Sequence, residues 1–147
     1  MIRKITEKDR TLFLRLSEEF YRSDAVSHAI PSSHHERAFE EVMRTDTYTE
    51  AFFIECGGEV AGYLLTSNAY SREAGGMMLW VEELYLMPQY RGRGLGQEAF
   101  AFIEQKAKQE DLRRIRLDVC ESNRRAIALY ERLGFGELEY KQMIKDL

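Results

Sequence analysis

The 147-residue sequence lacks the features that would place a protein in a membrane or outside the cell. No apolar run approaches the ~20 residues that a transmembrane helix needs, and the polar N-terminus, MIRKITEKDR, has no apolar stretch of the signal-peptide kind. The two cysteines, Cys56 and Cys120, lie far apart and show neither metal-ligand nor redox spacing. We therefore expect a cytoplasmic protein with no membrane partner.

A strong charge of one sign is also absent. The chain has 21 basic and 25 acidic residues, which gives a formal charge of −4. A weakly acidic chain is a poor general binder of nucleic acid, so we expect no nucleic-acid partner. The acidic excess lies in residues 1–60, whereas arginines concentrate in the second half. A local basic cluster there could still hold a phosphorylated small molecule.

The sequence has few residues or segments that would interrupt a folded domain, since it contains only two prolines and no low-complexity segment or linker. Its length suits one domain that is large enough to bury a core. The hydrophobic share of 44%, with eight Phe and eight Tyr, is typical of an ordered globular protein. We expect a single domain over residues 1–147.

The hydrophobic pattern predicts an α+β domain with the element order βααβββαβαββ. Apolar residues at helical spacing alternate with short runs rich in β-branched and aromatic residues. The expected elements are a strand at 2–5, a helix from the Thr6/Asp9 pair to Tyr21, a helix after Pro31, a hairpin at 51–66 turning at Gly57-Gly58, a strand at 77–86, a helix from Leu95, a strand at 115–120, a helix ending at Gly134, and two closing strands near 135–140 and 141–145.

The most informative segment joins a strand to a helix through Arg91-Gly-Arg-Gly-Leu-Gly-Gln97. Alternating glycines let the backbone approach a ligand closely and turn its N–H groups toward it. The start of the following helix adds unpaired N–H groups and the positive end of its dipole, and two arginines add cationic donors. The segment predicts a binding loop for a pyrophosphate, which we call the cradle (residues 91–97).

Two widespread phosphate-binding motifs do not fit the cradle. A dinucleotide-binding Gly-x-Gly-x-x-Gly counted from Gly92 would need a glycine where Gln97 stands, and the Gly-Lys-Ser/Thr of a P-loop is absent. The simpler alternative is a glycine-rich turn that binds nothing. Three glycines within five residues, flanked by arginines, exceed what a turn requires, so the pattern favours a ligand.

Two stretches together resemble a known family. Arg91–Gly96 is similar to the acetyl-CoA-binding motif Arg/Gln-x-x-Gly-x-Gly/Ala of the GNAT superfamily of N-acetyltransferases. Asn123–Phe135 resembles the second motif of that family, Asn-x-x-Ala-x-x-Leu-Tyr with a Gly-Phe ending. The motifs match in residue type, order and separation. The resemblance implies a GNAT-like fold, in which helices flank both faces of a mixed, mostly antiparallel sheet with splayed strands at the cofactor site.

The resemblance also implies acetyl-CoA as co-substrate and no metal. Strand backbone groups would pair with the pantetheine arm, the cradle would hold the pyrophosphate, and the start of the later helix would contact the cofactor. The strand residues are Leu84, Tyr85 and Leu86. The cradle residues are Arg91, Gly92, Arg93, Gly94, Leu95, Gly96 and Gln97. The helix-start residues are Asn123 and Ala126. Such roles need a gap between strands 77–86 and 115–120, because paired strands have no free N–H groups.

Acetyl transfer to an amine needs a base, because alkyl ammonium groups have pKa values near 10. Glu82 and Glu83 precede the expected cofactor contacts, and strand alternation predicts that they point to opposite faces. Resemblance to diamine-type acetyltransferases selects Glu82 as the base, with Glu83 as the alternative. It also implies that Tyr130 protonates the departing thiolate, although a core tyrosine would fit its apolar stripe. A backbone N–H near Leu84 would stabilise the oxyanion.

Other candidate residues have simpler explanations. Cys120 at a strand end is expected to be a small hydrophobe rather than an acyl carrier. His28, His34 and His35 have no matching cysteine or acid for a metal site, and the adjacent pair is expected to be polar first-turn residues. Trp80 is expected to pack on the sheet or to line the acceptor pocket.

The acceptor amine is the least determined feature. The acidic first half, with Glu18 and Glu19 near the segment 21–31, favours a small cationic amine such as a polyamine, although solvated helix carboxylates are the ordinary interpretation. Asn123–Phe135 also resembles protein N-terminal acetyltransferases, which act on a peptide α-amine. A non-catalytic acyl-CoA-binding module is a third reading of the cradle. We expect a homodimer, with Lys141–Lys145 as a pairing segment.

Overall fold

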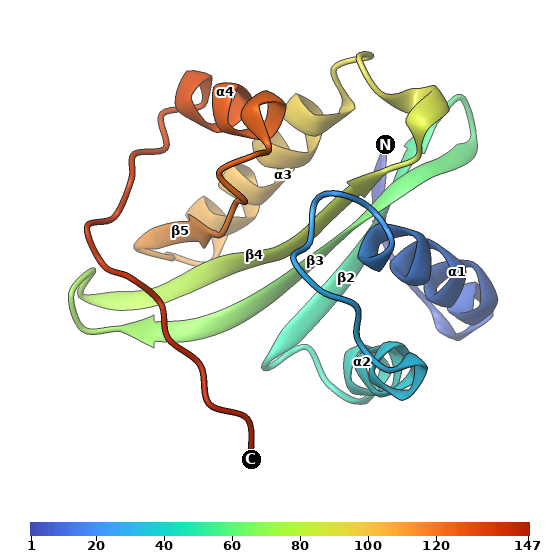
Figure 1. Cartoon of the computed structure of the whole chain (residues 1–147), viewed down its shortest axis with the longest axis horizontal. Helices are drawn as coiled ribbons and strands as arrows, with labels where there is room; N and C mark the ends of the chain where they lie inside the picture. Colours follow the sequence, from blue (N-terminus) through green and yellow to red (C-terminus); the bar gives the residue numbers. More distant parts are fainter.

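The computed structural model describes residues 1–147 and contains one five-stranded sheet with helices on both faces (Figure 1). The strands lie in chain order, antiparallel from β1 to β4, whereas β4 and β5 are parallel. This confirms the predicted mixed α+β fold. No helix is long and apolar enough to cross a membrane.

Along the chain the elements are β1 (Ile2–Lys4), the 3₁₀ turn η1 (Glu7–Asp9), α1 (Arg10–Tyr21), α2 (Ser32–Arg44), β2 (Thr49–Cys56), β3 (Glu59–Ser71), β4 (Gly76–Leu86), the 3₁₀ turn η2 (Pro88–Tyr90), α3 (Leu95–Gln109), β5 (Arg114–Leu117) and α4 (Arg124–Arg132).

Helices α1 and α2 cover one face of the sheet. The predicted cap of the first helix is present, because the Asp9 carboxylate accepts a hydrogen bond from the Thr6 amide at 2.8 Å. The apolar stripe of α1 then packs on the sheet, where Phe13 and Phe20 contact the ring of Tyr63 with centroid distances of 5.4 and 6.3 Å. These aromatic rings form the centre of the first core cluster.

Helices α3 and α4 lie on the opposite face (Figure 1). Leu95, Ala99 and Ile103 are buried along one side of α3, as the helical spacing predicted, whereas Phe102 of the same predicted stripe is only partly buried and Phe100 is buried instead. The helix also supplies the crossover that the parallel pair β4–β5 requires. The second core cluster therefore lies between α3 and the sheet.

Strand β4 loses one of its two neighbours halfway along its length. Met78–Val81 pair with β5, but Glu83–Leu86 pair only with β3, because β5 ends at Leu117 instead of continuing to residue 120. A β-bulge lies at the same point, since Leu65 is opposite Glu83 while Thr66 is opposite Val81. Glu82 is therefore the extra residue of the bulge. The predicted gap between the two strands is present.

The two closing strands predicted near 135–140 and 141–145 are wrong. Residues 136–147 form an unpaired tail that passes the end of the sheet at the β3–β4 hairpin (Figure 1). Two side-chain contacts hold it, from Tyr140 to Glu73 at 3.4 Å and from Gln142 to Asp118 at 2.5 Å. A two-stranded ribbon gains little stability on its own, and the apolar side chains of Met143 and Ile144 are exposed.

Candidate active site

The cradle presents six consecutive backbone N–H groups that donate to no other group of the chain, from Gly92 to Gln97. The last three belong to the first turn of α3, where N–H groups have no helical acceptor. Gly92 and Gly94 have φ of 78° and 83°, a conformation that other residues rarely adopt. Free N–H groups at the positive end of a 15-residue helix form an anion site suited to a pyrophosphate.

Glycine also lets α4 approach the cradle. A Cβ atom on Gly96 would lie 3.3 Å from the side chain of Leu129 on α4. A terminal guanidinium nitrogen of Arg125 would lie 3.7 Å from a Cβ atom on Gly92. Arg125 is one of the second-half arginines expected to form a basic cluster, and only the packing of α4 on α3 brings it to the cradle. The guanidinium adds positive charge where an anion would bind.

Arg91 differs from the other cradle residues, because both its backbone and its side chain already have partners. Its amide donates to the Pro88 carbonyl at 3.2 Å, and its Nε donates to the Leu86 carbonyl at 2.8 Å. The guanidinium carbon lies 5.9 Å from the ring centroid of Tyr85. Arg91 thus braces the turn that carries the cradle, and its amide is not available to a ligand.

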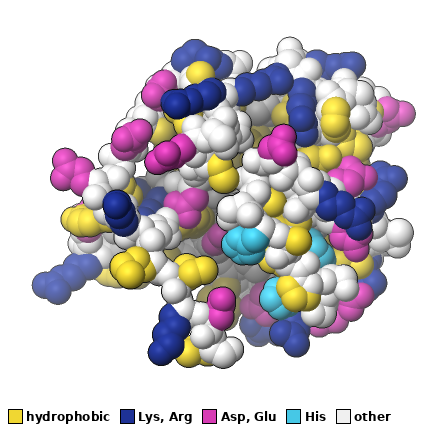
Figure 2. Space-filling model, viewed as in Figure 1, with side chains coloured by type: hydrophobic (Ala, Val, Ile, Leu, Met, Phe, Trp, Pro, Cys, Tyr) yellow, Lys and Arg dark blue, Asp and Glu magenta, His cyan; other side chains and the backbone are white.

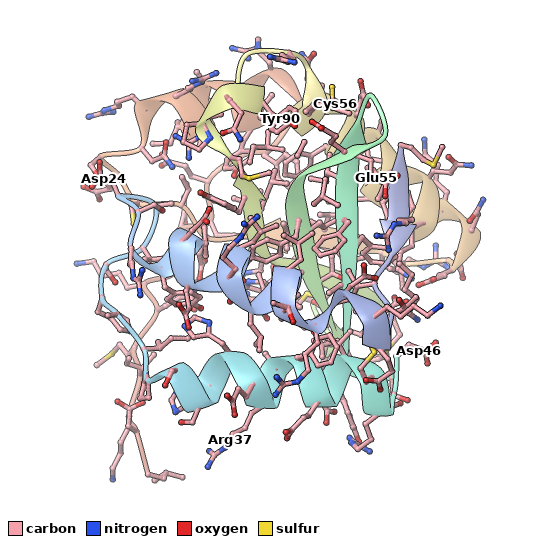
Figure 3. The ribbon with its side chains drawn as sticks, turned by 90° about the vertical axis from the view of Figure 1, so that its right-hand side faces the viewer. Asp24, Arg37, Asp46, Glu55, Cys56 and Tyr90 are labelled. Atoms are coloured by element: carbon pink, nitrogen blue, oxygen red, sulfur yellow. The ribbon has the colours of Figure 1, made fainter.

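The turn η2 ties the cradle to the β2–β3 hairpin. The Tyr90 hydroxyl donates to Glu59 at 2.6 Å, and the Arg93 guanidinium lies 5.4 Å from the Tyr90 ring centroid. In Figure 3, Tyr90 and Cys56 lie near each other at this end of the molecule. These contacts limit how far the cradle can move from the hairpin.

The second half of β4 offers a free backbone edge next to the cradle. Glu82–Leu86 have β3 on one side and no strand on the other. Leu84 and Leu86 point toward α3, whereas Tyr85 is buried in the cluster under α1. The edge can therefore accept an extended ligand as an added strand, as the resemblance implied for Leu84–Leu86.

Asn123 starts α4 as its N-terminal cap. Its Oδ1 accepts a hydrogen bond from the Ala126 amide at 3.2 Å, an arrangement that asparagine favours. The side-chain NH₂ group of Asn123 has no partner in the chain. The two predicted cofactor contacts are therefore joined by one hydrogen bond, and the NH₂ group of Asn123 stays free.

Tyr130 lies between α4 and α3. Its ring packs at 5.4 Å from Phe100 and 6.0 Å from Phe135, as measured between ring centroids. Burial raises the pKa of its hydroxyl above the usual value, and that hydroxyl makes no hydrogen bond within the chain. The ring therefore has a packing role, while the hydroxyl stays available as a donor.

The expectation that Glu82 and Glu83 point to opposite faces is wrong. The Ser67 hydroxyl donates to Glu82 Oε1 and the Tyr63 hydroxyl donates to Glu83 Oε2, both at 2.5 Å. Tyr63 and Ser67 are four residues apart on β3, so they share one face. The bulge at Glu82 adds one residue to β4 and brings both carboxylates to the side that faces α1. We call these two residues the acidic pair.

The two members of the acidic pair have very different surroundings. Glu83 is 9% exposed, and its Oε1 accepts a second hydrogen bond from Tyr21 at 2.9 Å. Burial raises the pKa of Glu83, and the neighbouring charge of Glu82 acts in the same direction. Glu82 is exposed. Figure 2 shows a hollow between the α1–α2 loop and the C-terminal tail, with acidic side chains visible inside it.

The α1–α2 loop lies across the end of the sheet at which the strands part (Figure 1). The Cys120 thiol donates to the Ala25 carbonyl of this loop at 3.5 Å. In Figure 3, Asp24 projects from the outer end of the same loop, away from Arg37 on α2. The loop therefore forms one wall of the site, in the place expected for segment 21–31.

The adjacent histidines His34 and His35 differ in their exposure to solvent. His34 is exposed, as expected for a polar residue in a first turn, but the expectation is wrong for His35, which is 4% exposed. His35 lies against α1, where its Nδ1 is 2.6 Å from the Ser17 hydroxyl. The structure contains no group of three His, Cys, Asp or Glu side chains suited to a metal ion.

Known proteins resemble this chain in sequence, and others resemble it in fold. The pattern of the acetyltransferase (GNAT) family matches residues 13–135. A thialysine N-epsilon-acetyltransferase of Mus musculus is 30% identical, over 93% of this chain and 84% of its own length. A spermine/spermidine N(1)-acetyltransferase of Bacillus subtilis is 31% identical, over 61% of this chain and 65% of its own.

A solved structure agrees in fold. The aminoglycoside N-acetyltransferase AAC(6')-Iy in complex with CoA superposes with a TM-score of 0.80 at 18% identity, over 99% of this chain and 93% of that one. At this identity the likeness concerns the fold alone. Together with the family match over residues 13–135, it leaves one assignment. The chain belongs to the acetyltransferase (GNAT) family and is an N-acetyltransferase.

Proposed function

We propose that the protein transfers the acetyl group of acetyl-CoA directly to a primary amine while both substrates are bound. The observation that carries this proposal is the meeting of two unpaired backbone surfaces, the amides of Gly92–Gln97 and the β4 edge at Glu82–Leu86. The first suits a diphosphate, and the second suits an extended arm that bears amide groups. CoA contains both, one after the other.

The residues assigned to the cofactor follow from this placement. Leu84, Tyr85 and Leu86 pair with the pantetheine arm through their backbone, and the amides from Gly92 to Gln97 hold the diphosphate, with Arg93 and Arg125 adding positive charge. The free NH₂ group of Asn123 donates to the cofactor beside Ala126. Arg91 acts by bracing the turn.

We propose a small cationic amine as the acceptor. The acidic pair faces the hollow under the α1–α2 loop, and Glu19 is held nearby by the Tyr85 hydroxyl at 3.2 Å. Carboxylates that share one recess attract an amine that carries more than one positive charge. One relative is named as an acetyltransferase of thialysine and another as an acetyltransferase of spermine and spermidine, and these acceptors are small cationic amines.

Glu82 is the proposed base. The acceptor arrives as an ammonium ion, because alkyl amines have pKa values near 10, and Glu82 is the exposed member of the acidic pair. Its carboxylate removes one proton, and the neutral nitrogen then attacks the thioester carbonyl. A free backbone N–H near Leu84 stabilises the oxyanion that forms. Glu83 is the alternative base.

Tyr130 is the proposed acid. Collapse of the tetrahedral intermediate releases a thiolate, whose conjugate acid has a pKa near 8.5. The Tyr130 hydroxyl has no partner in the chain and lies on the helix that flanks the cofactor edge. It can donate its proton to the sulfur as the carbon–sulfur bond breaks.

Two measurements on the purified protein test this function. Acetyl-CoA should raise the melting temperature by several degrees when it is well above its Kd. Free thiol should then be released with diamines or polyamines, in preference to a peptide with a free α-amine. No stabilisation by acetyl-CoA or CoA would contradict the proposal. Stabilisation without thiol release would indicate a binding module, and release with peptides alone would indicate a protein N-terminal acetyltransferase.

We also propose that the chain forms a homodimer through its tail. Met143 is 94% exposed and Ile144 81%, in a segment that makes no strand with its own sheet. A second copy could supply both a sheet edge and an apolar surface for residues 141–145. Removal of residues 141–147 should convert a dimer to a monomer in sedimentation or light-scattering measurements, and a wild-type monomer would contradict the proposal.

A further inference from the structure

A stacked pair of side chains beside the acidic pair has no part in the proposed reaction. The guanidinium carbon of Arg116 lies 4.4 Å from the centroid of the Trp80 ring. The two residues are register partners on β5 and β4, and both side chains are half-buried. Trp80 therefore packs on the sheet, as expected, but one face of its ring is covered by a cation. We call Trp80 and Arg116 the stacked pair.

The stacked pair belongs to the sheet face that lies under α1. Ser67 of β3 is the register partner of Trp80 on the other side, and register partners point their side chains to the same face. Tyr63 is four residues from Ser67, so it shares this face, and it is buried in the core cluster of α1. Ser67, Trp80 and Arg116 thus form one row across three strands. The guanidinium extends from β5 over β4, toward Glu82, which the Ser67 hydroxyl holds at 2.5 Å.

Arg116 has no acceptor for its hydrogen bonds within the chain, in contrast to its neighbours. Arg114 donates to Glu73 at 2.9 Å, and Asp118 accepts a hydrogen bond from the C-terminal tail at 2.5 Å. Cys120 donates to the α1–α2 loop at 3.5 Å. The tail and the loop are the two walls of the hollow (Figure 2). Arg116 makes neither a hydrogen bond nor an ion pair, so all five of its N–H donors are free.

Stacking prepares this guanidinium for a planar anion. A guanidinium that lies on an aromatic ring uses its face for the ring and keeps the N–H groups at its edge for hydrogen bonds. Two parallel N–H groups match the two oxygens of a carboxylate, and such charge-assisted pairs are among the strongest hydrogen bonds in proteins. The stacked pair is therefore a preformed site for a carboxylate that the chain itself does not supply.

The row also sets the distance between the free guanidinium and the proposed base. Ser67 and Arg116 are two strands apart, which corresponds to about 10 Å between their Cα atoms. Ser67 bonds to Glu82, and the guanidinium reaches back over Trp80, so the two charged groups are closer than that. A molecule that touches both groups carries an ammonium and a carboxylate joined by a chain of a few carbon atoms.

We propose that Arg116, held on Trp80, binds a carboxylate of the acceptor, so that the acceptor is an amino acid with a second amino group on its side chain. The inference rests on the proposed function and narrows its acceptor class. The side-chain ammonium meets Glu82 and the carboxylate meets Arg116. The α-ammonium keeps the second positive charge that the acidic recess attracts. Arg116 is then a specificity-determining residue.

Electrostatics favours this class over two others. A polyamine would place a positive chain beside a guanidinium that no carboxylate neutralises, and like charges at close range repel. A phosphorylated amine would bring nearly two negative charges into a recess that already contains the acidic pair. A diamino acid presents one group of the right sign to each end of the row, so it suits both Glu82 and Arg116.

Matched acceptors that differ only by the carboxylate test the inference through turnover. Such pairs are lysine and cadaverine, ornithine and putrescine, and 2,4-diaminobutyrate and 1,3-diaminopropane. The wild type should use the amino acid of its preferred pair with a kcat/KM at least about tenfold above that of the diamine. Arg116→Gln should lower kcat/KM for the amino acid about 10- to 100-fold, because a bidentate ion pair is lost, and should not lower it for the diamine.

Arg114→Gln is the matched control. Arg114 lies on the same strand but already bonds to Glu73, so this variant should keep the wild-type preference. Equal kcat/KM for both members of every pair in the wild type would overturn the proposal. An equal loss for both members in Arg116→Gln would show that the stacked pair only stabilises the site, which would also overturn it. A preference for phosphoethanolamine over the amino acids would overturn the choice of a carboxylate.

Fluorescence distinguishes failure of the inference from failure of the proposed function. Trp80 is the only tryptophan of the chain, so its emission reports on the stacked pair without turnover. With CoA bound, the preferred amino acid should change this emission in a saturable way, and the diamine should need a concentration about tenfold higher. Arg116→Gln should remove the difference.

The two measurements together assign each outcome. Acetylation of amines without a preference that depends on Arg116 would overturn the inference and leave the proposed function standing. Absence of acetylation together with the expected emission change would overturn only the proposed function. Absence of both acetylation and the emission change would overturn both.

Discussion

The two halves of strand β4 have the same backbone chemistry but different neighbours. Met78–Val81 are paired on both edges, by β3 and β5, and their side chains serve the core. Glu82–Leu86 are paired on one edge only, and this half carries the acidic pair and the proposed cofactor contacts. The change occurs at one residue, the bulge at Glu82.

The comparison shows how a sheet becomes a binding site. A strand that is fully paired has used its hydrogen-bonding groups, so it can offer only side chains. The short β5 leaves the second half of β4 with an unpaired edge, and the bulge turns two consecutive carboxylates to one face. Substitutions tied to the open half of β4 (Glu82–Leu86) should change turnover or cofactor binding, whereas substitutions elsewhere in the sheet should change stability alone.

The largest effect is expected at Glu82, at the boundary between the two halves. Glu82→Gln should lower kcat about 100-fold near neutral pH, because it removes the proposed base. The loss should shrink above about pH 10, where the amine is neutral without help. A pH profile of kcat measures both. Turnover unchanged at neutral and low pH would show that Glu82 is not the base, and a loss confined to Glu83→Gln would assign that role to Glu83.

The next effect is expected at Tyr130, across the gap from the open half. Tyr130→Phe should lower kcat about tenfold and leave the affinity for acetyl-CoA nearly unchanged, because the ring keeps its packing on Phe100 while the donor is lost. Tyr140→Phe is a control, since Tyr140 lies exposed in the tail. Weaker cofactor binding with normal kcat would instead mark Tyr130 as a packing residue.

An effect of similar size, on binding instead of turnover, is expected from the cradle, which continues the open half of β4 into α3. Gly94 and Gly58 have nearly the same φ, 83° and 85°, and a Cβ atom on either would meet no atom within 4 Å. Alanine at either position should therefore destabilise the fold by about 1 kcal/mol. Only Gly94→Ala should weaken acetyl-CoA binding, by about tenfold, because strain there displaces the free amides. Isothermal titration and urea unfolding measure the two quantities, and equal binding by both variants would contradict the cradle assignment.

The smallest effect concerns the β1 edge of the sheet, far from the open half of β4, where the Asp9 carboxylate serves stability alone. Hydrogen bonds from Arg3 lower the pKa of Asp9 to about 2. A lowered folded-state pKa contributes stability that is complete above the unfolded value and is lost as the pH falls toward about 2. Because the Arg3 side chain is 37% exposed, we expect Asp9→Asn to lower the free energy of unfolding by only about 1 kcal/mol at neutral pH, and by less in acid.

Urea unfolding at neutral and acidic pH measures this last difference. Asp111→Asn is its control, because Asp111 pairs with Arg113 while 81% exposed and should change stability little. Asp9→Asn should leave kcat unchanged, since Asp9 lies at the start of α1, far along the chain from the open half of β4. An equal loss of stability at both pH values would contradict the assigned charge effect.

Local patterns in the sequence predicted most of the fold. The apolar spacing in α3, the glycine pair of the β2–β3 hairpin and the Thr6/Asp9 cap each depend on residues within a few positions of one another, and the structure contains all three. The closing strands failed, because pairing depends on a distant edge and an apolar surface that local alternation does not report. The strand predicted at 115–120 ends at Leu117 for the same reason, since its pairing with β4 is not a local property of the sequence.

The sequence by itself determined the cradle, because glycine spacing and a helix start are local properties of a few adjacent residues. It also determined family membership, through two motifs that stand about 30 positions apart in the printed sequence. Only tertiary structure decided that Glu82 and Glu83 share a face, that Arg125 reaches the cradle and that His35 is buried against Ser17. Each of these depends on how one element packs or pairs with another, and the free energy of that packing is a property of the whole fold.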